Sequence, residues 1–265
     1  MSLLYVFAAS TSEARSVQQL MIRSKNDPPE MNSGRVGRNE VVLFVTGIGP
    51  KAAKSSAASA LNPSQVSTAP TALRRPDAVV VVGICGSLTP SIAEGEVNVY
   101  SECLSTEKDA TRLRCTAPLV KRITSLLSDK GISCRPAVGI SSERVATTKS
   151  EKLTLAKSGA DLVDMESYEI VAAAGQAALP VVVIRVVSDS LDRRLPDFNL
   201  VLQENGEINS LSLLKVAIGS PILTVKVLAA SRRALEKLKT VLAVVLADEA
   251  FSKGPPEAIL PSGST

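Results

Sequence analysis

Short runs of consecutive apolar residues recur along most of the chain, and polar, glycine-containing or small-residue segments separate them. Several of these runs are rich in β-branched residues and do not alternate with polar ones, which is typical of strands covered on both faces. Buried strands are predicted over 3–9, 41–45, 78–82, 137–141 and 181–187, and a short one is predicted to end at Val163. The run 97–104 alternates more, so we expect a strand with one wetter face.

The segments between the runs have helical character. Helices are predicted over 12–21, 51–61, 118–130, 150–156, from 164–166 through the alanines to 178, over 209–218 and over 221–251. The polar stretch 25–39 is predicted to be a loop or an irregular hairpin, and 62–76 is predicted to be a connection. Strands that alternate with helices in this way indicate an α/β three-layer sandwich, with a central mixed and mostly parallel sheet flanked by helices.

Length and composition are consistent with one large domain. The chain has 265 residues and 45% apolar composition, enough for a full core. We expect a single domain over residues 1–251, followed by a Pro/Gly/Ser-rich tail over 252–265 that has no core pattern.

Charge and cysteine usage exclude several classes of function. The net charge of +4 is spread along the chain, which argues against a nucleic-acid-binding stripe. The four cysteines show no Cys-x-x-Cys spacing and the chain has no histidine, so we expect no metal site, no cofactor and reduced thiols in a cytoplasmic protein. Residues 1–9 are predicted to be a first strand rather than a signal peptide, and no apolar run is long enough to span a membrane.

Acidic residues and glycines gather where the predicted strands end. Glu13 follows the first strand, Glu166 stands at the start of a helix, and Asp189 follows the run 181–187. Glycine-containing turns are predicted at 46–50 and 83–86. Ligands of open α/β sheets bind at the carboxyl ends of strands, so these groups are candidates for one crevice. Taken alone, each acid could instead cap a helix or lie in solvent at the end of an element.

A dinucleotide site is a poor explanation of the first glycine turn. The spacing from Gly47 can be aligned with G-x-G-x-x-A, yet 66–69 contains no acid to bind a ribose, and no phosphate-binding G-x-x-x-x-G-K-[ST] motif is present. Glycines that permit a tight strand-to-helix turn are the simpler interpretation.

Arg185 is a charged residue within an otherwise apolar strand. It lies about 13 Å along the strand from Asp189, too far for a direct ion pair. A buried guanidinium needs a partner, and we predict an acid on a neighbouring element, either Asp164 or Glu166. The alternative is an arginine whose head reaches solvent at the edge of the sheet.

Four segments carry a family resemblance. They are 44–53 (FVTGIGPKAA), 81–88 (VVGICGSL), 163–167 (VDMES) and 183–189 (VIRVVSD). In this order they resemble the nucleoside phosphorylase and nucleosidase superfamily, which includes purine nucleoside phosphorylase and methylthioadenosine/S-adenosylhomocysteine nucleosidase. Within it, 7–15 (FAASTSEAR) and 189–196 (DSLDRRLP) most resemble hopanoid-associated phosphorylases, with futalosine hydrolase as a near relative.

The resemblance implies cleavage of an N-glycosidic bond. Asp189 would be the acid that protonates the base, which requires a raised pKa, and Glu166 would accept hydrogen bonds from ribose hydroxyls, with Met165 beneath the ring. Further residues implied in substrate binding are Gly47, Ile48, Gly83, Ile84, Gly86, Val145 and Ser188, with Arg185 in support. Ser188 and Asp189 resemble the purine-specific versions, although Val145 stands where relatives often have an aromatic residue.

The nucleophile separates two reaction types. Phosphorylases of this superfamily bind phosphate with arginines at places that Glu13 and Val81 occupy here, whereas Glu13 matches the glutamate that activates water in nucleosidases. Hydrolysis is therefore favoured. Arg15 and Arg144 could rebuild an anion site, which keeps phosphorolysis as the alternative, and a non-catalytic nucleoside-binding protein is a second alternative.

The expected partners are a small nucleoside, with phosphate as a possible co-substrate, and further copies of the chain in a homo-oligomer. The C-terminal helical region adds one more hypothesis. Its segments 222–230 and 241–247 are apolar around a basic middle, 232–239. This pattern suits a peripheral membrane contact if the substrate is a hopanoid nucleoside. The alternative is packing on the protein's own sheet or on a partner subunit.

Overall fold

A computed structural model of the chain describes residues 1–23, 32–62, 74–200 and 221–252. The predicted helix 209–218, most of the connection 62–76 and the tail from 253 lie outside the described residues. The strands are β1 Leu3–Ala8, β2 Ser33–Val36, β3 Asn39–Val45, β4 Ala78–Ser87, β5 Val97–Ser105, β6 Leu113–Arg114, β7 Cys134–Ser141, β8 Leu162–Asp164 and β9 Val181–Asp189. The helices are α1 Thr11–Gln18, α2 Pro50–Leu61, α3 Ala117–Asp129, α4 Lys149–Ala156, α5 Ser167–Gln176 and α7 Pro221–Val245, with short 3₁₀ turns η2 Phe198–Leu200 and η3 Glu249–Ser252.

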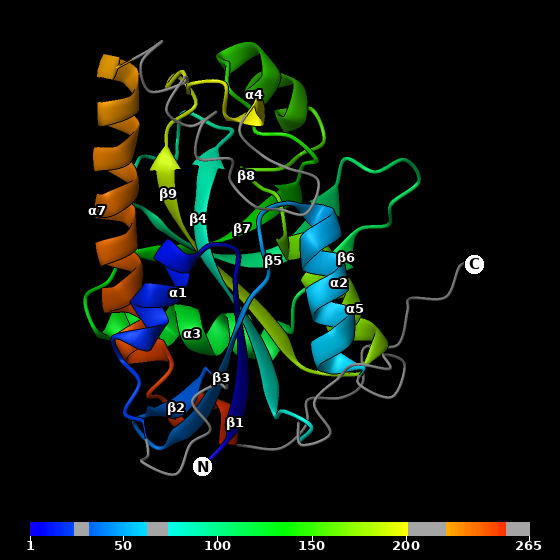
Figure 1. Ribbon diagram of the computed structural model, residues 1–265, viewed down its shortest axis with the longest axis vertical. Coiled ribbons are helices and arrows are strands. Elements are labelled where there is room, and N and C mark those ends of the chain that lie inside the picture. The colour runs from blue at the N-terminus through cyan, green and yellow to red at the C-terminus, as the bar shows by residue number, and fades with distance from the viewer. Residues whose placement is uncertain (24–31, 63–73, 201–220, 253–265) are drawn as a thin grey trace.

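The elements form three layers around the sheet. Helices α2 and α5 pack against each other on one side, and α1, α3 and α7 cover the other (Figure 1). The three-layer α/β sandwich with a mixed sheet is thereby confirmed. One described part of the polar stretch 25–39 is a hairpin, in which β2 pairs antiparallel with β3.

The sheet closes on itself, which the sequence pattern does not predict. β4 pairs with β8, β8 with β7, β7 with β5, β5 with β9, and β9 again with β4. The order β1, β3, β2 extends from β4 as an open wing. Strand β4 therefore joins the closed part of the sheet to the wing.

Strand β4 changes neighbour midway along its length. On one edge it pairs with β1 as far as Val82 and with β8 from Gly86 onward, so Gly83, Ile84 and Cys85 lie between the two partners. The segment 83–86 was predicted to be a turn, and this is wrong. Pairing with β9 on the other edge continues through it, with a bulge between Cys85 and Gly86. We call the interval 83–85 the seam.

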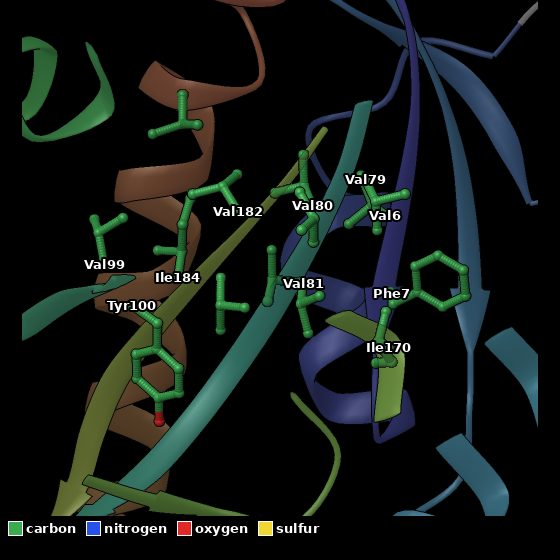
Figure 2. Packing of buried hydrophobic residues seen from close by; sticks show 14 of the residues in the cluster. Val6, Phe7, Val79, Val80, Val81, Val99, Tyr100, Ile170, Val182 and Ile184 are labelled. Atoms are coloured by element: carbon green, nitrogen blue, oxygen red, sulfur yellow. The ribbon is translucent and has the colours of Figure 1, made fainter. Parts of the chain in front are cut away.

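The core is built mainly from β-branched strand residues. All nine residues of β9 are buried, as are most of β1 and β4. Figure 2 shows Val80, Val81, Val182 and Ile184 packed between the layers. Arg185 lies in the middle of this apolar strand with 1% of its surface exposed, so its charge has to be compensated inside the protein.

Helix α7 buries most of its apolar face on the protein itself. It packs on β9 and β4, and Leu238, Val241 and Leu242 are fully buried. The hypothesis of lipid contact is therefore wrong for the segment 241–247. It stays a prediction only for the first turns, where Val225 and Leu228 are 65% and 61% exposed. Within the described residues, no helix combines the length and apolar character that a membrane span requires.

Candidate active site

Glu13 links the start of α1 to the seam. The helix begins with a capping box, in which the Ser10 side chain accepts from the Glu13 amide and the Glu13 carboxylate accepts from the Ser10 amide. Its Oε2 takes three donors, the amides of Ala9 and Ser10 and the Ser10 hydroxyl, at 2.9–3.1 Å. Its Oε1 accepts from the Ile84 amide at 2.9 Å. The carboxylate thus pairs a seam amide that β1 leaves without a strand partner.

Two acids at the start of α5, Asp164 and Glu166, have different hydrogen-bond partners. Glu166 was predicted in the first helical turn, but it is the N-cap residue and its side chain does not cap the helix. Asp164 does so instead, because its Oδ1 accepts from the amides of Glu166 and Ser167 at 3.0 Å and from the Ser141 hydroxyl at 2.7 Å. The Glu166 carboxylate is directed elsewhere and accepts from the Gly49 amide at 3.0 Å.

Arg185 brings the three carboxylates together. Its guanidinium lies 3.5 Å from Asp164 Oδ2, 3.5 Å from Glu166 Oε2 and 3.9 Å from Glu13 Oε1. It also donates to Ser167 Oγ at 2.8 and 3.2 Å. The prediction that Arg185 pairs with Asp164 or Glu166 is confirmed, with both acids as partners. We call Glu13, Asp164, Glu166 and Arg185 the carboxylate cluster.

Gly83 makes room for this cluster. A Cβ atom at this position would collide with the Arg185 guanidinium and the Glu13 carboxylate. The two glycines of the other turn have a different function: Gly47 and Gly49 adopt φ values of 83° and 99°, which L-residues rarely take. The amide of Gly49 is then free to reach Glu166.

The cluster has an excess of negative charge, and the pKa values reflect it. Burial raises the pKa of Glu166 to about 7, and the charges of Asp164 and Glu13 add to this against the attraction of Arg185. Burial also acts to raise the pKa of Asp164, but Arg185 and the donors from Ser167 outweigh it and the pKa is lowered. Burial acts to lower the pKa of Arg185, and the surrounding carboxylates raise it instead.

Asp189 ends β9 opposite Gly86, its neighbour across the bulge. A Cβ atom at Gly86 would lie 2.8 Å from Asp189 Oδ2, so the glycine keeps this side open. Ser188 Oγ lies 2.8 Å from Asp189 Oδ1 and 3.1 Å from the Cys85 carbonyl, and so positions the acid. The other oxygen of Asp189 contacts the ammonium of Lys152.

Sequence reasoning missed Lys152. The residue lies in α4, which begins at Lys149 with Thr148 as N-cap rather than at Ser150. In the sequence, a lysine in a short polar helix suggests a solvent-exposed side chain, although Lys152 shares a helical face with Leu155 and Ala156, which pack against the core. The signal that would have located it is the capping box of Thr148 and Glu151, because this box fixes the rotation of the helix.

A pocket opens beside Asp189. Its lining residues are Gly86, Arg144, Val145, Ala146, Val163, Asp164, Met165, Asp189 and Leu195. Among the predicted site residues, Asp189, Met165, Gly86 and Val145 line it, whereas Glu13 and Glu166 belong to the carboxylate cluster. Gly47, Ile48, Gly83, Ile84 and Ser188 do not line the pocket, and their predicted contacts with substrate stay predictions. Asp164 belongs to both the pocket and the cluster, so the two are contiguous.

Two loops meet over the pocket. The side chain of Asn199 accepts from the Val145 amide at 2.8 Å and donates to the Val145 carbonyl at 3.1 Å. The Leu195 amide donates to the Thr147 carbonyl at 2.9 Å. The loop before α4 and the loop after β9 are therefore joined where they face Asp189. The described part of the chain contains no group of side chains arranged to hold a metal ion.

One family model matches most of the chain. The family model described as the phosphorylase superfamily matches residues 23–216, a span that contains Glu166, Arg185 and Asp189 and begins after Glu13. No curated protein gives a significant match in sequence.

Solved structures resemble the fold over nearly the whole chain. Futalosine hydrolase of Helicobacter pylori strain 26695 matches with a TM-score of 0.69 at 14% identity, covering 92% of this chain and 97% of the other. The 5'-methylthioadenosine/S-adenosylhomocysteine nucleosidase of Neisseria meningitidis, in complex with methylthio-immucillin-A, gives 0.69 at 16% identity, with 93% and 99% covered. The corresponding nucleosidase of S. pneumoniae, with a transition-state inhibitor, gives 0.69 at 17%, with 92% and 98% covered.

Proposed function

Because the chain belongs to the phosphorylase superfamily, we propose that it cleaves the N-glycosidic bond of a purine-type nucleoside, with water activated by Glu13 as the nucleophile. Solved nucleosidases share the fold, which supports nucleoside cleavage in general. The choice of water and of a purine base rests on the site residues.

The observation that carries the choice of water is the charge of the carboxylate cluster. Arg185 is the cation in contact with Glu13 among the described residues, and it already faces three carboxylates. A phosphate dianion bound here would add negative charge beside Glu13 in a buried site, which is costly. A neutral water molecule carries no such cost, and a carboxylate can accept its proton.

The two oxygens of Glu13 are not equivalent for this purpose. Oε2 accepts three hydrogen bonds and is fully occupied by the capping box. Oε1 accepts only from the Ile84 amide and faces Arg185 at 3.9 Å. Oε1 is therefore the oxygen that would take the proton of the attacking water.

The pocket and the cluster suit the two ends of a nucleoside. The base would lie in the pocket against Met165 and Val145, where Asp189 could donate a proton to a ring nitrogen. The ribose would extend toward Glu166, whose ionised carboxylate accepts hydroxyl hydrogen bonds. Because the pKa of Glu166 is raised to about 7, this acceptor becomes fully ionised only above neutral pH.

Phosphorolysis remains the second candidate because of one residue. Arg144 lines the pocket, and its charge could attract an anion there. It lies on the Asp189 side of the site, whereas the predicted nucleophile approaches from the Glu13 side. Arg15, the other cation considered from the sequence, is exposed.

The experiment is release of free base from adenosine, methylthioadenosine, S-adenosylhomocysteine and futalosine, each with and without phosphate. We expect release without phosphate, with the sugar hydrolysed at C1 as the second product: ribose from adenosine, and the correspondingly 5'-substituted ribose from the other three. In Glu13→Gln the amide oxygen can still accept the capping-box hydrogen bonds, but the amide NH2 cannot accept from the Ile84 amide. We therefore expect some loss of stability together with a loss of activity of roughly 10²–10⁴-fold, and circular dichroism checks that the variant is folded. Glu143→Gln, on the exposed loop, is the matched control. Strict phosphate dependence, or full activity of Glu13→Gln, would contradict the proposal.

A further inference from the structure

The inner face of helix α4 combines apolar residues with a buried charge. Leu155 and Ala156 are partly buried against the small hydrophobic cluster around Val163, and Lys152 lies one turn before them on the same face. Its one fully buried residue is Lys152, with 0% of its surface exposed, while the neighbouring Leu153 is 45% exposed. Burying a leucine stabilises a fold, whereas burying an ammonium group costs free energy unless it is paired. In a helix that only covered the sheet, an apolar residue at position 152 would stabilise the fold more than a lysine. The orientation of α4 therefore points to a task for Lys152 beyond packing.

The start of the helix fixes this orientation. Glu151 Oε2 accepts from the amides of Thr147 and Thr148 at 2.7 and 3.0 Å, and the Thr148 side chain accepts from the Glu151 amide. This capping box holds Glu151 toward the preceding loop. The next side chain, Lys152, is thereby directed at the end of β9.

The Lys152 ammonium has three N–H donors and three acceptors around it. One is the Asp189 carboxylate, a second is the Ser190 carbonyl at 2.7 Å, and the third is the Arg193 carbonyl at 3.5 Å. All three belong to Asp189 and the loop that follows it. This same loop carries Leu195 to the pocket wall.

We propose that Lys152 is a positioning residue that makes Asp189 an effective acid toward the substrate base. The inference rests on the proposed function. When Asp189 gives its proton to a ring nitrogen, the electron pair of the glycosidic bond goes to the base and negative charge develops on the Asp189 carboxylate. The fixed ammonium stabilises that charge as it forms and keeps its own three protons. Its two carbonyl contacts hold the loop over the pocket.

Other charged groups near Asp189 do not replace Lys152. Arg193 is engaged by the Glu94 carboxylate, with Nη2 2.8 Å from Oε2. Burial raises the pKa of the Cys85 thiol, so this neighbour stays neutral. Among the described residues, Lys152 is the cation in direct contact with the acid.

The test compares Lys152→Met with Lys149→Met. Lys149 lies on the same helix and pairs with Asp192 of the same loop at 2.6 Å, but this pair is on the surface. We expect Lys152→Met to lower kcat at neutral pH by about tenfold, a part of what general acid catalysis contributes. Lys149→Met should stay within about twofold, as exposed pairs contribute little. KM should stay within about twofold in Lys152→Met, because the loss falls on the step in which charge develops on Asp189.

A double-mutant cycle with Asp189→Asn separates positioning from mere packing. In the Asp189→Asn background, Lys152→Met should cost less than about twofold in kcat, since the group that the lysine serves is gone. An equal loss in both backgrounds, or a loss confined to KM, would overturn the proposal.

The same double-mutant cycle can be measured by thermal unfolding, which tests the Lys152–Asp189 pair even if the protein cleaves no nucleoside. Lys152→Met should lower the Tm more than the double variant does, because the single change leaves a buried carboxylate without its cation. Additive Tm changes would overturn the pairing. Absence of any base release together with a non-additive Tm would contradict the proposed function while leaving the Lys152–Asp189 coupling in place.

Discussion

Replacing Glu166 by glutamine is predicted to stabilise the protein at alkaline pH and to have a much smaller effect in acid. Burial and the charges of Asp164 and Glu13 raise the pKa of Glu166 from 4.5 to about 7 in the folded protein. The folded state therefore binds this proton more tightly than the unfolded state. Stability falls as pH rises through this interval, and the full loss is present above pH 7.

The size of the effect follows from the pKa difference. A shift of about 2.5 pH units, at about 1.4 kcal/mol for each, corresponds to about 3 kcal/mol of lost stability. A glutamine at this position does not titrate, and its side-chain oxygen can still accept from the Gly49 amide. The free energy of unfolding of Glu166→Gln relative to the parent should thus rise between about pH 5 and 7 by up to about 3 kcal/mol and level off above.

Urea unfolding at four pH values from 5 to 8 measures this difference. Circular dichroism is the suitable probe, because the chain has no tryptophan and three tyrosines. Glu143→Gln on the exposed loop controls for the amide replacement itself. A difference that is independent of pH, or that shrinks as pH rises, would refute the electrostatic reasoning for the cluster. The stabilised variant should cleave nucleosides poorly, since an amide is a weaker acceptor for ribose hydroxyls than a carboxylate.

Two further substitutions test the charge balance of the carboxylate cluster and the space that it occupies. Arg185→Met should destabilise the protein by roughly 3–5 kcal/mol at pH 7, because it leaves buried carboxylates without their cation. The loss should be smaller at pH 5, where these carboxylates can take up protons. Urea unfolding at the two pH values measures the difference in the free energy of unfolding. Gly83→Ala should cost about 1–3 kcal/mol and most of the activity, because its Cβ would displace Arg185 and Glu13. Gly175→Ala is its matched control, since nothing lies within 4 Å of the added atom and alanine favours a helix; equal losses in the two variants would contradict the steric argument.

The elements that local pattern determines were predictable. A strand with apolar residues on both faces is unfavourable in contact with water, so β9 was expected to be covered on both faces. Asp189 was expected at its carboxyl end. The need of a buried guanidinium for an acid predicts Asp164 or Glu166 as the partner of Arg185, and both are partners. In both cases the decisive physical requirement lies within one segment.

Features that depend on distant segments were missed. The glycines at 83–86 suggest a turn locally, but pairing with β9 supplies hydrogen bonds that keep β4 extended. Glu166 is in position to cap α5, yet Asp164 takes that role and leaves the glutamate for Gly49 and Arg185. The local capping box of Thr148 and Glu151 indicates the rotation of α4, but it does not indicate that the end of β9 lies beside Lys152.

The seam explains why the proposed chemistry lies where it does. A central strand that exchanges one neighbour for another leaves backbone amides to be paired by side chains, and here Glu13 pairs that of Ile84. A carboxylate brought into the core for this structural reason needs a cation, which β9 supplies as Arg185. The same cation allows two more acids, Asp164 and Glu166, to be buried within reach. Glu13, the acid that would activate water, is thus also the group that pairs the seam amide. A substitution of Glu13 therefore affects folding as well as catalysis, and its stability has to be measured beside its activity.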